Sequence, residues 1–259
     1  MPAPEIGLLS QLWSMKGRLV RLPGAYQAYQ VVTKRFGEGQ VYPIRIGPMR
    51  GFKWRRYNSL PYWYHLGLWE PEVSRLIASH LRPGDCFWDI GANAGYHTLI
   101  GSRSVGPTGT VLAIEADPNV ARMCREELEL NHVSNVELVN LAVADADEPV
   151  TLLVRENNLL NSLASVGGEG TPVEVPGFRL DTLLARHRRP HLIKMDIEGA
   201  ERTALHHGEA LFSGPDRPRI LLSTHGEDIK DVCERFLLDH DYVVEGGPGF
   251  EHMLVGIPR

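Results

Sequence analysis

The stretch Phe87-Trp88-Asp89-Ile90-Gly91-Ala92-Asn93-Ala94-Gly95-Tyr96 decides the fold of this chain. An apolar run from Cys86 to Ile90 ends at a turn of small residues, which predicts a buried strand of a parallel sheet. Gly91 and Gly95 allow the backbone to turn sharply and to approach a ligand closely. The sequence that follows has helical character, and a helix offers unpaired N–H groups and the positive end of its dipole. The stretch therefore predicts a strand–turn–helix unit that could hold a phosphate or an amino-acid carboxylate.

The same alternation of strand and helix continues towards the C-terminus. We expect strands at residues 86–90, 110–116, 136–143, 192–197 and 219–224. We expect helices between them at residues 95–104, 118–131, 180–188, 200–208 and 230–240. Strands 242–245 and 252–257, joined by a Gly-rich turn, suggest an antiparallel pair at one edge. The pattern predicts an α/β, doubly wound, Rossmann-like sheet.

Two regions depart from this rhythm. Residues 149–177 hold two short expected strands, 150–155 and 172–175, around a polar loop, and we interpret them as an insertion beside the site. Residues 1–80 form an aromatic-rich extension, expected to be helical over 11–36 with a weak strand at 41–46. This extension could serve as a lid, shape the substrate pocket or mediate oligomer contacts, although plain packing is an equal alternative. Residues 81–259 would then form the ligand-binding domain.

The composition is that of an ordinary soluble domain. Of 259 residues, 43% are hydrophobic and 23% charged, and the net charge of -5 makes nucleic acid a poor default partner. The three cysteines are far apart, which argues against a disulfide framework or a metal knuckle and suits a reducing compartment. No secretory signal is recognisable, and no apolar run approaches the ~20 residues that span a bilayer. We therefore expect a cytoplasmic enzyme with no membrane span.

The turn after the first strand differs from the dinucleotide fingerprint. Asn93 stands where G-x-G-x-x-G needs its second glycine. Asp89, just before the turn, would repel a pyrophosphate, whereas it could bind the ammonium group of a methionine moiety, directly or through water. These two residues favour S-adenosylmethionine over NAD as the cofactor.

Later strand ends supply the other candidate cofactor contacts. Glu115 ends the second strand 24 positions after Gly91, where an acid can accept both ribose hydroxyls of an adenosine. The alternative is that Glu115 is a solvated residue at a strand end with no binding role. Ala116 continues the loop that would pass near the adenine. At the end of the third strand, the backbone of Ala142–Val143 could bracket the adenine, with Asp145 near its amino group.

A cluster of acids follows the fourth strand in Ile193-Lys194-Met195-Asp196-Ile197-Glu198-Gly199-Ala200-Glu201. Asp196 emerges from an apolar run and should point into the crevice. Capping and solvent exposure are the simpler interpretation for Glu198 and Glu201. Carboxylates at this place could also bind a divalent metal such as Mg²⁺, with Asp196 and Glu198 as ligands if any, or could take a proton.

These motifs resemble the FkbM family of S-adenosylmethionine-dependent methyltransferases, and the acid cluster is the most specific of them. The resemblance covers about three quarters of the chain, from about Leu68 to the end. Its pieces are Trp69-Glu70-Pro71-Glu72, Asp89–Gly95, Glu115-Ala116, Asn140–Val143, Asn161-Ser162 and Ile193–Glu201.

The resemblance implies a class I methyltransferase fold and O-methylation of a sugar, polyketide or other specialised metabolite. It also implies that Glu70 approaches the methionine end of the cofactor. The strand after the acid cluster often ends in Glu-x-His in similar proteins, whereas this chain has Ser223-Thr224-His225, so the histidine is kept and the glutamate is missing.

Methyl transfer to a hydroxyl needs alignment and help with the proton. His225 and Asp196 are the candidate catalytic residues, and His97 is a third candidate that packing explains more simply. Asn161 and Ser162 in the insertion could hold a small or glycosylated acceptor. The competing hypotheses are an NAD-dependent oxidoreductase, a non-catalytic binding module on the same fold and, less favoured, an RNA methyltransferase. The sequence leaves the acceptor, metal dependence and a homo-oligomeric state open.

Overall fold

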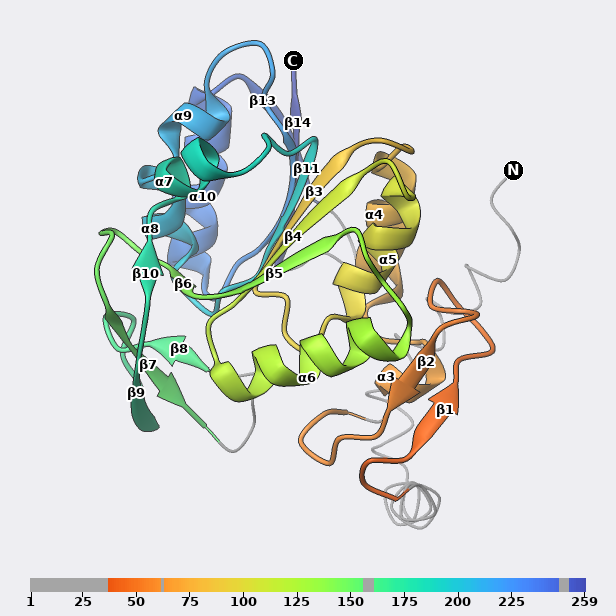
Figure 1. Ribbon diagram of the computed structural model, residues 1–259. Helices are drawn as coiled ribbons and strands as arrows, with labels where there is room; N and C mark the ends of the chain where they lie inside the picture. The colour runs from red at the N-terminus through yellow and green to blue at the C-terminus, as the bar shows by residue number, and fades with distance from the viewer. Residues whose placement is uncertain (1–36, 62, 156–160, 247–251) are drawn as a thin grey trace, which may run out of the picture.

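A seven-stranded sheet forms the centre of the protein (Figure 1). The computed structural model describes residues 37–61, 63–155, 161–246 and 252–259, so the helix expected over 11–36 lies outside the described residues. The strand order is β13-β14-β12-β11-β3-β4-β5, and the five strands from β12 to β5 are mutually parallel. Those five are β3 (Cys86–Ile90), β4 (Thr110–Glu115), β5 (Val136–Asn140), β11 (Leu192–Met195) and β12 (Arg219–Ser223).

The far edge of the sheet is antiparallel, as the sequence predicts. Strand β14 (Met253–Pro258) runs antiparallel to β12 on one side and to β13 (Tyr242–Glu245) on the other. The parallel strands place all their carboxyl ends at one edge of the sheet, where ligands bind in open α/β folds. The polar residues predicted at strand ends therefore meet at that edge.

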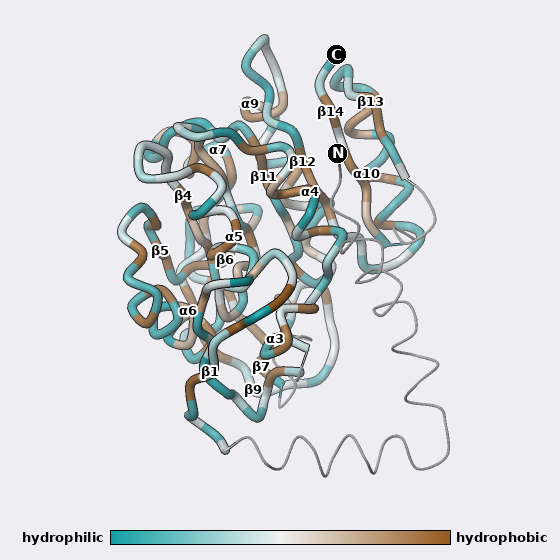
Figure 2. Tube along the Cα trace, turned by 90° about the vertical axis from the view of Figure 1, so that its right-hand side faces the viewer, coloured by the Kyte–Doolittle hydropathy of each residue, from teal (hydrophilic) through white to brown (hydrophobic). Residues whose placement is uncertain are grey.

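Helices cover both faces of the sheet, which confirms the doubly wound prediction. Alternate residues of β3 face opposite sides: Phe87 packs in one buried cluster with Leu99, and Trp88 packs in another with Phe212. The interior strands are largely hydrophobic, as the brown colour along β11 and β12 shows (Figure 2). No helix among the described residues is long and apolar enough to cross a membrane.

The two groups of helices differ in what they cover. The first group contacts β3, β4, β5 and β11: α4 (Pro71–His80), α5 (Tyr96–Val105) and α6 (Pro118–Leu130). The second group covers the other face and shares one buried cluster with residues of β3, β4, β11 and β12: α7 (Leu180–Arg186), α8 (Glu201–His206), α9 (Glu209–Phe212) and α10 (Glu227–Asp239). Of these, α10 also contacts β13 and β14.

The described part of the extension packs against α5 and α6. It forms a hairpin of β1 (Val41–Pro43) and β2 (Lys53–Arg55), followed by α3 (Trp63–Leu66). Trp54 is fully buried, with its ring 5.4 Å from that of Tyr64 and 5.7 Å from that of Tyr96. The strand expected over 41–46 ends at residue 43, and the chain then turns at residues 47–51.

The insertion forms a small antiparallel sheet of its own. Strand β7 (Val150–Val154) pairs with β9 (Thr171–Val175) and with β8 (Ser162–Leu163), a short strand that the sequence interpretation left within a loop. The rest of that loop, residues 156–160, lies outside the described residues.

The prediction of one continuous strand over 136–143 is wrong. The strand ends at Asn140, and β6 (Ala142–Val143) pairs instead with β10 (Gly177–Phe178). The side chain of Asn140 donates hydrogen bonds to the carbonyl oxygens of Glu115 and Ala116 at 2.8 and 2.9 Å. These bonds lie where the β4 ladder ends, so the chain leaves the main sheet and turns towards the insertion.

Candidate functional site

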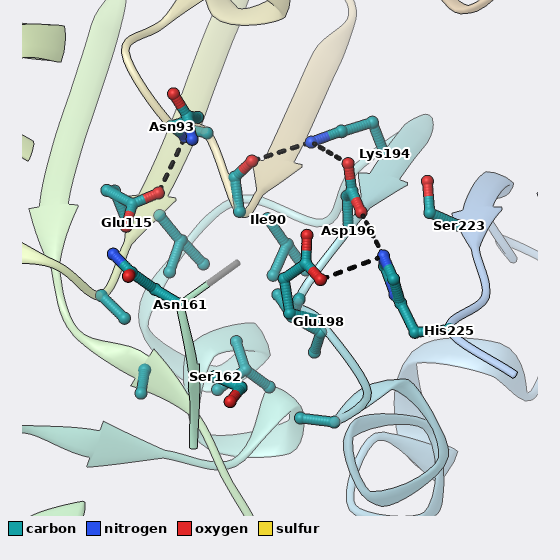
Figure 3. Close-up of a pocket in the computed structure, with 18 of the residues that line it drawn as sticks. Ile90, Asn93, Glu115, Asn161, Ser162, Lys194, Asp196, Glu198, Ser223 and His225 are labelled. Atoms are coloured by element: carbon teal, nitrogen blue, oxygen red, sulfur yellow. Dashed lines mark hydrogen bonds and ion pairs between the residues drawn. The ribbon is translucent and has the colours of Figure 1, made fainter. Parts of the chain in front are cut away.

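A cavity of about 550 Å³ opens at the carboxyl ends of the central strands (Figure 3). Its volume lies within the range of small-molecule sites. The turn after β3, the ends of β4, β11 and β12, the start of the insertion and the segment before α4 all contribute to its wall. Most of the predicted site residues therefore meet in one place, although the chain separates them widely.

Two glycines and a pair of backbone hydrogen bonds shape the small-residue turn after β3. Gly91 has a φ of 76°, and a Cβ added there would lie 1.9 Å from the carbonyl oxygen of Asp196. The N–H groups of Gly91 and Ala92 both donate to the carbonyl oxygen of Ile114 at 2.9 Å, which ties the turn to β4. Gly95 has a φ of 87°, and a Cβ there would lie 2.8 Å from Cys124 Sγ. Gly91 lines the cavity, whereas Gly95 lets α5 approach α6.

Two backbone N–H groups hold the Glu115 carboxylate on the cavity wall. Its Oε2 accepts from the backbone N–H of Asn93 at 2.8 Å, and its Oε1 accepts from that of Asp117 at 2.9 Å. Asn93 itself adopts a left-handed φ of 50°, which is uncommon for a residue other than glycine. Burial raises the pKa of Glu115 to about 7, while the two backbone hydrogen bonds oppose that rise. Each oxygen keeps a second lone pair, so this carboxylate fits two neighbouring ribose hydroxyls.

Asp89 lies behind the turn that follows β3. It is fully buried and is not part of the cavity wall. Its Oδ2 accepts from Thr98 Oγ1 at 2.6 Å, and Lys194 Nζ lies 3.6 Å from its Oδ1. Burial raises the pKa of Asp89, and the Lys194 ammonium opposes this. The structure thus places Asp89 behind the turn, beside Lys194 and Thr98, and a contact with a cofactor ammonium, directly or through water, stays a prediction.

The wall expected to surround the adenine is mostly present. Ala116, Ala142 and Val143 line the cavity. Asp145, two residues beyond β6, does not line it and is exposed. The structure therefore gives no support to an adenine contact from Asp145.

Asp196, Glu198 and His225 form a second polar group on the cavity wall. The Nε2 of His225 lies 3.6 Å from Asp196 Oδ1 and 3.4 Å from Glu198 Oε2. One ligand atom from each of the three lies within 4.8 Å of the others, so the set could hold a metal ion. Burial lowers the pKa of His225, but the bond to Glu201 and the charges of Glu201, Glu198 and Asp196 outweigh it and raise the pKa to about 9.

The sequence analysis predicted the wrong environment for Glu201 and assigned no role to Lys194. Glu201, expected to be exposed, is fully buried, and its Oε1 contacts His225 Nδ1 at 2.8 Å and accepts from the N–H of Ile197 at 3.2 Å. Lys194, which received no role, is buried, and its Nζ donates to the carbonyl oxygen of Gly91 at 2.8 Å. The signal for Lys194 was available, because a charged residue in an apolar strand needs a partner. Nothing in the local pattern separates Glu201 from a surface helix residue.

Glu70 and His97 line the cavity together. Glu70 precedes α4 and adopts a left-handed φ of 39°. His97, in the first turn of α5, places Nε2 3.9 Å from Glu70 Oε2. Burial lowers the pKa of His97 well below its usual value, and the charge of Lys194 adds to this effect.

Asn161 and Ser162 also line the cavity, but their polar atoms have partners in the protein. Asn161 donates from Nδ2 to Asp117 Oδ2 at 2.7 Å and accepts at Oδ1 from the N–H of Arg155 at 2.8 Å. Ser162 Oγ donates to the carbonyl oxygen of Gly167 at 3.3 Å. These contacts fasten the insertion to the start of α6, and an acceptor-binding role stays a prediction.

Comparison with known proteins identifies the family of this chain. A family model described as the methyltransferase FkbM domain matches residues 89–244, which is more than half of the chain. The chain belongs to the FkbM methyltransferase family. The sheet order, with one antiparallel strand inserted next to the far edge, is accordingly that of the class I methyltransferase fold.

Curated relatives match over short segments. The chain is 37% identical over 62 residues to a protein-L-isoaspartate O-methyltransferase of Ignicoccus hospitalis, covering 24% of this chain and 29% of that protein. It is 29% identical over 120 residues to an arsenite methyltransferase of Halobacterium salinarum, covering 44% of this chain and 30% of that protein. The chain thus spans less than a third of the length of these two relatives.

Solved structures resemble the protein at low identity. A precorrin-6y C5,15-methyltransferase from Geobacter metallireducens is 19% identical with a TM-score of 0.48, covering 73% of this chain and 89% of that one. Fibrillarin from Aeropyrum pernix, solved with bound S-adenosyl-L-methionine, is 11% identical with a TM-score of 0.46, covering 72% and 74%.

Proposed function

We propose that this FkbM-family protein is an S-adenosylmethionine-dependent O-methyltransferase that acts on a hydroxyl of a sugar, polyketide or other specialised small metabolite. One observation carries the proposal. The Glu115 carboxylate, held by two backbone N–H groups, opens into the same cavity as Asp196 and His225. A ribose-binding acid and a proton-handling pair thus share one site.

The residues present fit this cofactor. Glu115 would hold the ribose hydroxyls, Ala142 and Val143 would border the adenine, and Glu70 would approach the methionine end. When bound, S-adenosylmethionine supplies an electrophilic methyl group: the acceptor oxygen forms the new C–O bond as the S–C bond breaks, which leaves S-adenosylhomocysteine and one proton to remove. A cavity that holds both reactants in line supplies much of the rate by alignment.

The cluster around His225 would take the proton of the acceptor hydroxyl. Asp196 would accept a hydrogen bond from the acceptor hydroxyl, and His225 Nε2, 3.6 Å from Asp196 Oδ1, would receive the proton. Glu201 holds Nδ1 and so directs Nε2 towards the cavity. Three carboxylates favour the protonated imidazole, and the positive charge of a bound sulfonium acts in the opposite direction, so cofactor binding would prepare His225 to accept the proton.

The same three side chains offer a second form of assistance. Asp196, Glu198 and His225 provide two carboxylates and one imidazole, a set that suits Mg²⁺ poorly at the nitrogen and Mn²⁺ or Fe²⁺ better. A bound cation would hold the acceptor hydroxyl and lower its pKa. Activity that survives EDTA would favour direct proton transfer to His225. Activity lost to EDTA and restored by Mn²⁺ or Mg²⁺ would favour a hydroxyl acidified by the bound cation, with its proton released to solvent.

Binding and transfer test the proposal separately. The purified protein is titrated calorimetrically with S-adenosylhomocysteine and, in parallel, with NAD⁺. Glu115→Ala is compared with Glu129→Ala, which removes an exposed acid from α6. We expect saturable binding of S-adenosylhomocysteine only, lost in Glu115→Ala and retained in Glu129→Ala. Binding of NAD⁺ instead would favour the oxidoreductase alternative.

The acceptor is then sought by incubation with isotopically labelled S-adenosylmethionine and panels of hydroxylated metabolites. Transfer of one methyl group to oxygen, identified by mass spectrometry, supports the proposal. Binding of S-adenosylhomocysteine without transfer to any acceptor class would favour the non-catalytic binding module. Transfer to nitrogen, or to RNA or protein, would contradict the acceptor class proposed.

A further inference from the structure

His97 is a buried polar side chain with an unused atom on the cavity wall. Only 5% of the residue is exposed, and its ring packs edge-on against Tyr96, with the centroids 5.5 Å apart. Its Nε2 is buried and has no hydrogen-bond partner among the described residues. Buried polar atoms are nearly always paired, so an unpaired one facing a cavity points to a missing ligand atom.

The charge state of His97 limits what that ligand atom can be. Burial and the Lys194 ammonium hold its pKa well below the usual range, so the imidazole is neutral and carries one N–H. The side chain stands in the first turn of α5, a helix of ten residues whose N-cap, Gly95, offers no side-chain hydrogen bond. The N–H groups and dipole of a helix start favour an anionic group there.

Glu70 lies beside His97, and its carboxylate favours a cationic group. Its Oε2 lies 3.9 Å from His97 Nε2. A left-handed φ of 39° at a glutamate is an uncommon conformation, and such conformations concentrate at ligand sites. The residue is held there from both sides: Trp69 stacks on Tyr64 with centroids 4.5 Å apart, and the carbonyl oxygen of Glu70 accepts from the N–H of Ser74 at 3.0 Å.

A carboxylate acceptor and a neutral N–H donor 3.9 Å apart are complementary to a group that bears an ammonium and a carboxylate on one carbon. We propose that Glu70 and His97 bind the amino-acid end of the cofactor as a pair, Glu70 accepting from the α-ammonium and His97 donating from Nε2 to the α-carboxylate. The inference rests on the proposed function and adds His97 as a residue that determines cofactor recognition. Lys194 is less suited to the task, because its Nζ already donates to Gly91 and lies between Asp89 and Asp196.

Four ligands test the pairing by calorimetry. They are S-adenosylhomocysteine, its decarboxylated analogue, its deaminated analogue and 5′-methylthioadenosine, which lacks both groups. His97→Phe keeps a buried ring but removes the donor, and His97→Gln restores a donor. We expect His97→Phe to weaken S-adenosylhomocysteine and the deaminated analogue about 10- to 100-fold, as for a hydrogen bond to a charged group. The other two ligands should bind it as they bind the wild type, and His97→Gln should recover part of the loss.

Glu70→Gln should show the opposite selectivity, weakening S-adenosylhomocysteine and the decarboxylated analogue. Equal losses of all four ligands in His97→Phe, with an unchanged thermal unfolding midpoint, would overturn the inference by assigning His97 to packing. Equal wild-type affinity for S-adenosylhomocysteine and 5′-methylthioadenosine would also overturn it while leaving the adenosine site intact. A wild-type protein that binds none of the four would instead contradict the proposed function.

Discussion

The two halves of the cavity are built by different means. The cofactor half, here Gly91, Asn93 and Glu115, is fixed by backbone: two N–H groups hold the carboxylate, and no space remains for a Cβ at Gly91. The acceptor half, here Asp196, Glu198 and His225, consists of side chains that are 25%, 28% and 33% exposed and that contact one another, Glu201 and Lys194.

Backbone geometry therefore determines the shape of the cofactor half, whereas side-chain identity determines the chemistry of the acceptor half. Changes in the cofactor half should alter stability and cofactor affinity, since its shape depends on φ angles and close backbone contacts. Changes in the acceptor half should alter the rate of transfer and leave cofactor affinity intact. Each prediction below tests that division, with the largest expected effect first.

Asp196→Asn and His225→Gln should each lower kcat for methyl transfer by about 10²- to 10⁴-fold, the usual contribution of a positioned proton acceptor. The dissociation constant of S-adenosylhomocysteine should stay within about twofold of the wild-type value. Steady-state kinetics and calorimetry on the same preparations measure both. A loss of cofactor affinity as large as the loss of kcat would contradict the separate roles given to the cofactor half and the acceptor half.

Gly91→Ala should destabilise the protein by about 2–5 kcal/mol, because it adds a left-handed alanine and a clash with the Asp196 carbonyl oxygen. Gly39→Ala is the matched control: its φ of 78° is nearly the same, but nothing lies within 4 Å of the added Cβ. The control should cost only about 1–2 kcal/mol. Urea denaturation midpoints compare the two, and equal costs would mean that the turn is not packed as described.

Glu201→Gln should lower kcat about tenfold, because the neutral amide holds the His225 imidazole less firmly than the buried carboxylate does. Cofactor affinity should not change, since Glu201 is not part of the cavity wall. Glu209→Gln, at an exposed acid of α9, is the control. An unaltered kcat in Glu201→Gln would show that this contact does not position His225 for transfer.

Affinity for S-adenosylhomocysteine should fall by up to about tenfold between pH 8 and pH 6, the limit for a single group whose pKa is about 7. Glu115, with a pKa of about 7, accepts ribose hydroxyls best when it is ionised, and lowering the pH protonates it. The sign is therefore weaker binding in acid. Glu115→Gln should remove this pH dependence, and a wild-type affinity that rose towards pH 6 would contradict the role given to Glu115.

The same division explains which parts of the fold the sequence predicts. The strand, turn and helix from Cys86 to Val105 follow from an apolar run, two glycines and a helical pattern, all of them local signals. The end of β5 at Asn140 does not, because the bonds that end it reach Glu115 and Ala116, about 25 residues away in sequence. Local patterns carry no record of such distant contacts.

The site divides in the same way. Glu115, Asp196 and His225 could be placed together from the sequence because parallel strands bring their carboxyl ends to one edge. The partner of the buried Glu201 carboxylate is His225, 24 residues later, and Asp145 follows β6, which pairs with β10 outside the main sheet. Polar residues at regular strand ends are thus predictable, whereas those whose partners lie on another element are not.

The most direct test of this account is a crystal structure of the protein with S-adenosylhomocysteine. We expect both ribose hydroxyls on the Glu115 carboxylate, the amino-acid end between Glu70 and His97, and the sulfur facing Asp196 and His225 across the cavity. A ligand whose ribose lies away from Glu115, or whose sulfur faces away from Asp196, would contradict it.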